Sequence, residues 1–135
     1  MPTRLFKLFR SQAAPDDGLT QPQREAIVDL LHFCMYADNH IALAEDKILD
    51  DTVSVLNWDP GASFDSYESR SIARVREAKD HADVRDAFFA SIQQRLSSKA
   101  ARALAIDVCQ QLFLSDGVKS DREAQLEARL KQLLR

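Results

Sequence analysis

Glycine and proline are scarce in this chain, whose 135 residues contain three glycines and four prolines, clustered outside the runs with helical periodicity. Folds built from many short strands need turn residues more often than this. Apolar residues instead recur at spacings of four, seven and eight, which place them on one face of a helix. The sequence therefore predicts an all-α fold, a compact bundle of about seven helices in one domain.

Cysteines are few, and long apolar runs are missing. The two cysteines, Cys34 and Cys109, lie in apolar helical runs without CxxC or Cys/His spacing, which argues against a zinc or redox site. Buried free thiols are the favoured interpretation and fit a reducing compartment, while a bridge between them stays open. No apolar run approaches the roughly 20 residues that cross a bilayer, and no apolar segment follows the basic amino terminus. We expect a cytoplasmic protein.

Neither sign of charge dominates the sequence. It contains 18 Lys and Arg and 21 Asp and Glu, which gives a net charge of −3. A nucleic-acid binder should carry a basic face, so we expect no nucleic-acid partner. A mildly acidic protein can hold cations. One helix side is locally basic but interspersed with acids, which favours a solvated face; it carries Arg70, Arg74, Arg76 and Lys79.

Signs of catalysis are also missing. A hydrolase or transferase needs a nucleophile near a base, or a glycine-rich phosphate loop. The three glycines are isolated, and the histidines His32, His40 and His81 lie far apart in sequence. We therefore expect a protein that is not an enzyme.

The amino-terminal residues 1–19 are expected to form a short amphipathic helix and a linker ahead of the helical domain, residues 20–135. Within residues 4–10, apolar side chains occupy one helical side and three cations the other. One interpretation is a docking helix for a membrane surface or an acidic partner. The favoured interpretation is a helix that folds back onto its own core, because one or two turns anchor weakly.

Two stretches share an acidic spacing. Asp38-Asn-His-Ile-Ala-Leu-Ala-Glu45 and Asp116-Gly-Val-Lys-Ser-Asp-Arg-Glu123 each place an aspartate at the end of one helical run and a glutamate in the first turn of the next. When these stretches are aligned, Ala26-Ile-Val-Asp-Leu-Leu31 pairs with Leu104-Ala-Ile-Asp-Val-Cys109. The repeated unit is a helix, an acidic turn and a second helix. We expect two related hairpins packed together, with the intervening segment on one side.

Helix boundaries follow from capping signals. Thr20 is a predicted N-cap with Gln23 in capping-box position, and Ser120 is paired with Glu123 in the same way. Ser97 or Ser98 is expected to cap the helix before the second acidic turn. After the amino-terminal helix, the expected helices are 20–37, 43–56, 65–79, 84–96, 98–113 and 120–134.

The repeated acids have two interpretations. They can serve as caps, accepting hydrogen bonds from the free N–H groups that begin the next helix. Alternatively, Asp38, Glu45, Asp116 and Glu123 converge on a hard divalent cation such as calcium or magnesium, which prefers oxygen ligands. The spacing is not that of an EF-hand, whose glutamate stands at position twelve of the loop, whereas here it stands at position eight.

The two acidic motifs resemble the tellurite-resistance TerB family and its wider TerB-like superfamily, over residues 26–56 and 104–134. The resemblance implies a compact seven-helix fold, a site for a divalent metal, and a role in tellurite and other stress responses. It carries Asp38, Glu45, Asp116 and Glu123 over as the metal-site residues. The first copy departs from the second, with Asn39 in place of a glycine and Ala42 in place of a serine. His40 has no counterpart in the second copy. It is either an accessory ligand or, as the favoured interpretation, a solvated loop residue.

The expected function is that of a TerB-like stress-response domain that binds a divalent cation at the paired acidic site and acts through an unidentified protein partner. The alternative is a metal-independent helical interaction module in which the acids are only helix caps. A third interpretation is a membrane-peripheral adaptor that uses residues 4–10.

Overall fold

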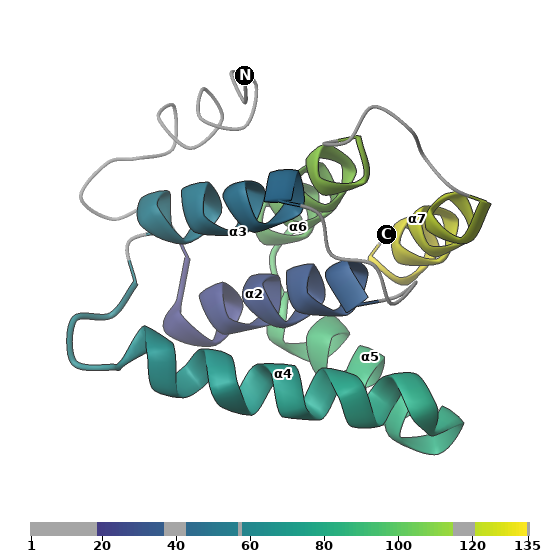
Figure 1. Ribbon diagram of the computed structural model, residues 1–135, viewed down its shortest axis with the longest axis horizontal. Coiled ribbons are helices and arrows are strands. Elements are labelled where there is room, and N and C mark those ends of the chain that lie inside the picture. The colour runs from purple at the N-terminus through teal and green to yellow at the C-terminus, as the bar shows by residue number, and fades with distance from the viewer. Residues whose placement is uncertain (1–18, 37–42, 57, 115–120, 135) are drawn as a thin grey trace.

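The computed structural model describes residues 19–36, 43–56, 58–114 and 121–134, with only the backbone described for residues 43–46 and 55. These ranges form six helices and no strand, so the predicted all-α fold is confirmed (Figure 1). The helices are α2 (Gln21–Tyr36), α3 (Leu43–Val55), α4 (Phe64–Asp80), α5 (Ala82–Arg95), α6 (Lys99–Phe113) and α7 (Asp121–Leu133). The expected helix at residues 4–10 lies outside the described residues.

Side-chain caps begin α2 and α6 where the sequence indicates them. Thr20 and Gln23 form the predicted capping box, because the Gln23 side chain accepts from the Thr20 amide at 3.0 Å and Thr20 Oγ1 accepts from the Gln23 amide at 3.3 Å. Ser98, rather than Ser97, caps α6 by accepting from the Ala101 amide. The predicted break after α4 is shorter than expected, since His81 alone separates α4 from α5.

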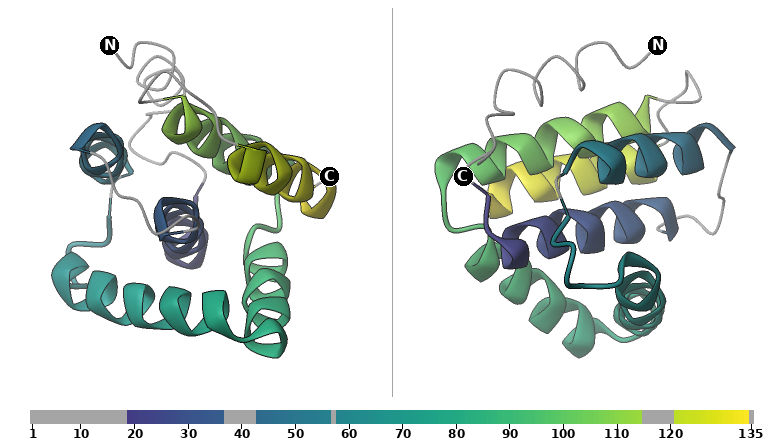
Figure 2. Two further views of the ribbon diagram at one scale, coloured as in Figure 1. Left: turned by 45° about the vertical axis from the view of Figure 1, so that its right-hand side comes forward. Right: turned by 90° about the vertical axis from the view of Figure 1, so that its left-hand side faces the viewer.

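Helix α2 is the centre of the bundle and packs against α3, α4, α5 and α6. Its residues from Ala26 to Met35 are all buried. Helices α4 and α5 meet at a corner that covers one side of α2, as the left view of Figure 2 shows. The expectation that the intervening segment fills one side of the molecule is confirmed.

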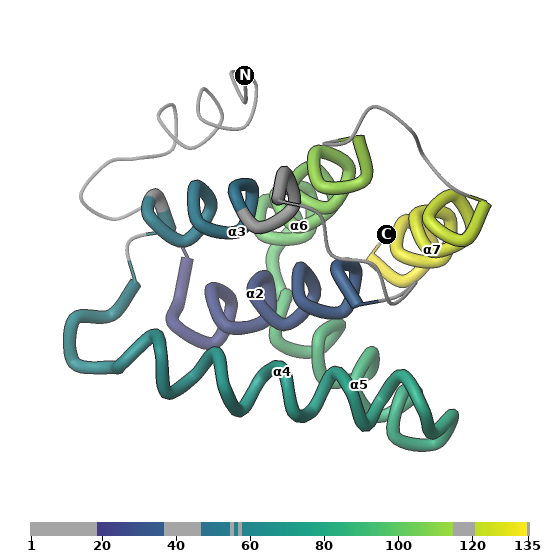
Figure 3. The backbone as a smooth tube through the Cα atoms, viewed as in Figure 1, coloured from purple at the N-terminus to yellow at the C-terminus, as the bar shows by residue number. Residues whose placement is uncertain are grey.

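The two hairpins predicted from the repeat are present as α2–α3 and α6–α7, and α2 packs directly on α6. Helices α2 and α6 run in the same general direction, and α3 and α7 return (Figures 2 and 3). Both helices that lead into an acidic turn therefore end on the same side of the bundle. Among the described helices, none is both long enough and apolar enough to cross a membrane.

Candidate functional site

The acidic corners are only partly described. Asp38 and Asp116, with the rest of residues 37–42 and 115–120, lie outside the described residues, and Glu45 is described by its backbone alone, in the first turn of α3. Glu123 lies in the first turn of α7, as predicted, and its side chain is buried at 6 % exposure. That the four acids meet therefore stays a prediction. The structure adds one observation, the burial of the Glu123 side chain.

Glu123 occupies a position that favours a carboxylate. The first turn of a helix presents free N–H groups and the positive end of the helix dipole, which stabilises an acid by about 0.3–1 kcal/mol. The predicted partner of its capping box, Ser120, lies outside the described residues. In the described part of the chain, no group of three or more His, Cys, Asp and Glu side chains is placed to hold a metal ion.

Cys34 and Cys109 lie together in the core, where α2 packs on α6. Both are 2 % exposed, and their Sγ atoms are 3.7 Å apart across the α2–α6 contact. They are free thiols. The interpretation of two buried free thiols on one face is therefore the one that the structure supports.

A buried carboxylate that we did not predict as a site organises the contact between α2, α4 and α5. Asp29, fully buried in α2, accepts hydrogen bonds from Tyr67 at 2.7 Å and from Ser71 at 2.6 Å. Arg95 reaches it from α5 at 2.8 Å and Arg74 from α4 at 3.2 Å. Arg74 therefore forms an ion pair with a buried carboxylate, although its own side chain is about half exposed, and does not belong only to the solvated face expected for its helix.

The charge of Asp29 shifts the ionisation of its neighbours. Burial raises the pKa of Tyr67, and Asp29 raises it further, so its hydroxyl keeps its proton. Burial alone lowers the pKa of Arg95, but the charge and hydrogen bond of Asp29, with a smaller contribution from Tyr67, raise it overall. The cluster is therefore one carboxylate held by two arginine side chains and two hydroxyl donors.

His32 completes this cluster in its neutral form. Burial lowers its pKa to about 4, with Asp29 working in the opposite sense and Arg74 adding to the lowering. Its Nδ1 lies 2.8 Å from Ser71 Oγ, and its Nε2, which has no hydrogen-bond partner, lies 3.5 Å from a carboxylate oxygen of Glu68. Because the Ser71 proton points to Asp29, Nδ1 must donate to Ser71, which leaves Nε2 without a proton.

Serine, histidine and aspartate thus meet here in an order that does not activate the serine. A nucleophilic serine gives its proton to a histidine that a carboxylate orients. In this protein Ser71 donates to Asp29 and accepts from His32, and all three side chains are fully buried. The cluster fixes how α2, α4 and α5 pack.

One signal in the sequence pointed to Asp29. It stands in the middle of an apolar run, and it aligns with Asp107 in the second hairpin, which is also buried, at 7 % exposure. The repeat therefore contains a pair of acids inside its first helices as well as the acids at its turns. An acid at a core position of a helix indicates a partner elsewhere in the chain.

Comparison of the chain with family models, with curated proteins and with solved structures finds no match.

Proposed function

We propose that this chain is a TerB-like, non-catalytic stress-response domain, linked to tellurite resistance. It binds a divalent cation, calcium or magnesium, at its paired acidic turns, and it acts in the cytoplasm through a protein partner. The observation that carries the proposal is the arrangement of the hairpins. Because α2 and α6 run in the same direction and pack together, the turns that follow them start from the same end of the bundle.

The chemistry of the four acids supports a hard cation. Each turn contributes an aspartate and a glutamate, Asp38 with Glu45 and Asp116 with Glu123. Oxygen ligands from two adjacent turns suit calcium or magnesium, and a bound cation relieves the repulsion between carboxylates brought close together. The burial of Glu123 supports the proposal because a carboxylate held away from water binds a counter-ion more strongly.

The competing function is an interaction module without metal, in which the same acids only cap helices. The capping box at Thr20 and Gln23 favours it, because it shows that this chain begins a helix with reciprocal side-chain bonds. Glu123, in the first turn of α7, is suitably placed for the same role. The two functions differ in their response to added cations.

Thermal unfolding of the chelator-treated protein separates them. An ion that binds only the folded state stabilises it by about 2.7 kcal/mol at a hundredfold excess over Kd, which for a chain of this size raises the midpoint by about 5–10 °C. We expect this rise with calcium or magnesium, and its loss in the Asp38→Asn/Asp116→Asn double variant. The matched control is Asp50→Asn/Asp80→Asn, which removes two exposed acids away from the turns.

Either of two results would reject the cation site. The midpoint could stay constant with each ion at millimolar concentration, or the control could lose the rise as fully as the turn variant. A double variant that is less stable than the parent both with and without ions, by the same amount, supports the capping function instead.

A further inference from the structure

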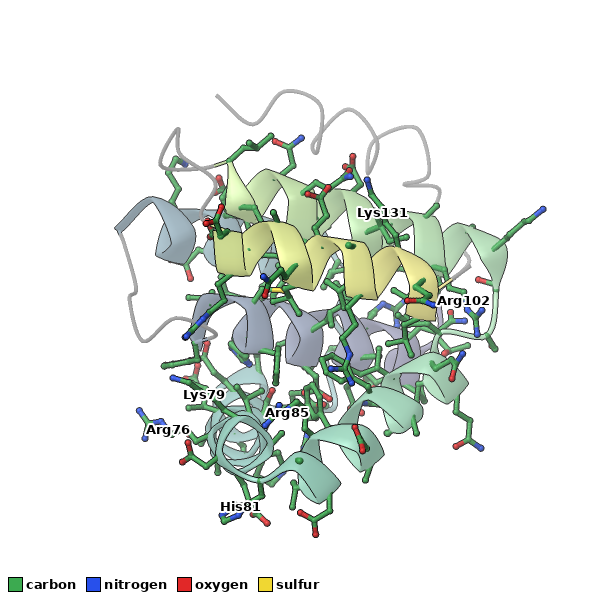
Figure 4. The ribbon with its side chains drawn as sticks, turned by 90° about the vertical axis from the view of Figure 1, so that its right-hand side faces the viewer. Arg76, Lys79, His81, Arg85, Arg102 and Lys131 are labelled. Carbon is green, nitrogen blue, oxygen red and sulfur yellow. The ribbon has the colours of Figure 1, made fainter. Side chains whose placement is uncertain are left out.

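A cleft of about 400 Å³ lies between α7 and the corner formed by α4 and α5, with α2 beneath it. Its lining residues come from these four helices. Figure 4 looks onto this face and shows Lys79 and Arg85 near the carboxyl end of α4, below α7. The volume is within the range of pockets that hold small molecules, about 300–1,000 Å³.

The lining is strongly basic in a chain whose net charge is −3. It contains Lys79, Arg85, Arg122 and Arg129, and no aspartate or glutamate is among the described residues that line it. Cations gathered on low-dielectric walls produce a positive potential that attracts anions. The expected ligand therefore carries negative charge.

Arg85 and Arg129 have different roles in the cleft. Arg85 is a fixed part of the wall, because its guanidinium donates to the carbonyl oxygens of Ala78 and Lys79, both at 3.1 Å. Arg129 stacks its guanidinium 4.9 Å from the Phe89 ring centroid and meets Asp86 at 3.6 Å. Both members of that ion pair are more than half exposed, so it is weak and an incoming anion can compete for Arg129.

The floor of the cleft is apolar. Phe33, Phe89 and Leu126 line it with side chains that are 7 %, 3 % and 9 % exposed. The two rings pack edge to face, with centroids 4.9 Å apart, which holds them in place. Such a floor accepts an apolar group and gives a bare inorganic ion no partner.

We propose that this cleft binds a small organic anion, with a carboxylate or phosphate head among Lys79, Arg122 and Arg129 and an apolar body on Phe33, Phe89 and Leu126. Arginine suits both heads because its planar fork of N–H donors matches their oxygens. A concave site of this size fits a small molecule better than a flat protein surface. The inference is independent of the acidic turns and of any cation bound there.

The test uses calorimetric titration of the full chain with four probes. They are 1-naphthoate, 1-naphthyl phosphate, the neutral analogue 1-naphthalenemethanol, and inorganic phosphate. We expect at least one of the two aryl anions to bind at least about tenfold more tightly than the alcohol and than inorganic phosphate. The difference between the two aryl anions identifies the preferred head, and either preference is consistent with the site.

Variants locate the site. Arg122→Gln/Arg129→Gln removes two cations of the rim and should weaken binding of the preferred anion by at least about tenfold. Lys99→Gln removes an exposed cation at the start of α6, outside the cleft, and should leave binding within twofold. Thermal unfolding of each variant, recorded in parallel, verifies that the protein titrated is folded.

Three results would overturn the inference. The aryl anions and the alcohol could bind equally, which removes the anion preference, or none of the probes could bind. Binding could also survive in the Arg122→Gln/Arg129→Gln variant, which would place the site elsewhere. If that variant does not fold, the single variant Arg129→Gln replaces it, and unchanged binding there has the same meaning.

Discussion

The sulfur atoms of Cys34 and Cys109 lie 3.7 Å apart where α2 packs on α6. This contact joins the two hairpins, because each cysteine belongs to the first helix of its own hairpin. Both thiols are buried and free, and their separation is well beyond the roughly 2.05 Å of a disulfide bond. The pair therefore reports on whether the two hairpins are in contact.

The first prediction concerns the access of reagents to these thiols. In the native protein both should react with an aqueous disulfide reagent slowly, at a rate set by opening of the α2–α6 contact, because each is 2 % exposed. Denaturant should accelerate the reaction until two thiols per chain react at once. The time course of absorbance measures this, with Cys34→Ala and Cys109→Ala assigning each thiol. Reaction of both within seconds in native buffer would contradict the packing.

The second prediction concerns the buried carboxylate. Asp29→Asn removes the charge that Arg95 and Arg74 share and should lower the free energy of unfolding by about 2–4 kcal/mol, reduced from the full cost of a buried pair because both arginines touch solvent. Urea unfolding followed by circular dichroism measures it. Arg74→Met is the matched control and should cost less than about 1 kcal/mol, since the Arg74 side chain is 47 % exposed. Equal losses in the two variants would show that Asp29 is not the centre of the cluster.

The third prediction follows from the lowered pKa of His32. In the unfolded chain His32 takes up a proton near pH 6.5, and in the folded protein only near pH 4. The contribution of neutral His32 to stability is therefore fully present above about pH 6.5 and is lost as the pH drops toward 4. The loss should approach about 3 kcal/mol across this window. His32→Gln, which does not titrate, should lack this part of the pH dependence. Urea unfolding at several pH values between 7 and 4 compares the two proteins, and parallel curves would refute the assignment.

The fourth prediction concerns the end of α4. Arg85→Met removes the two hydrogen bonds that the guanidinium gives to the Ala78 and Lys79 carbonyls, and should destabilise the protein by about 1–2 kcal/mol. Lys99→Gln removes a charge from an exposed residue at the start of α6 and should cost less than about 0.5 kcal/mol. Thermal unfolding ranks the two variants. The reverse order would mean that Arg85 does not cap α4.

The sequence was sufficient for the features that depend on neighbours along the chain. The capping box of Thr20 and Gln23 follows from local spacing, and the burial of Cys34 and Cys109 follows from their places in apolar helical runs. The structure contains both features. The fold class follows from helical periodicity in the same way. Each of these needs only that apolar faces be buried and that helix ends be capped.

The Asp29 cluster could not be assembled in advance, because its partners are distant in sequence. Tyr67 and Arg95 lie 38 and 66 residues away from Asp29, on helices whose mutual packing the sequence does not specify. Arg74 lies on a helix side that also carries exposed charges, and only the packing of α4 on α2 shows that this arginine reaches inward. The basic cleft could not be predicted for the same reason, since its cations come from three helices that are separate in sequence.

The enclosure of α2 has a consequence for local motion. Because α3, α4, α5 and α6 all pack on it, no single neighbour can detach and leave its central amides open to water. Hydrogen–deuterium exchange in residues 26–35 should therefore require unfolding of the whole domain, and its rate gives the global stability directly. During synthesis α2 is made before α6, and it can therefore reach its protected state only after α6 has followed.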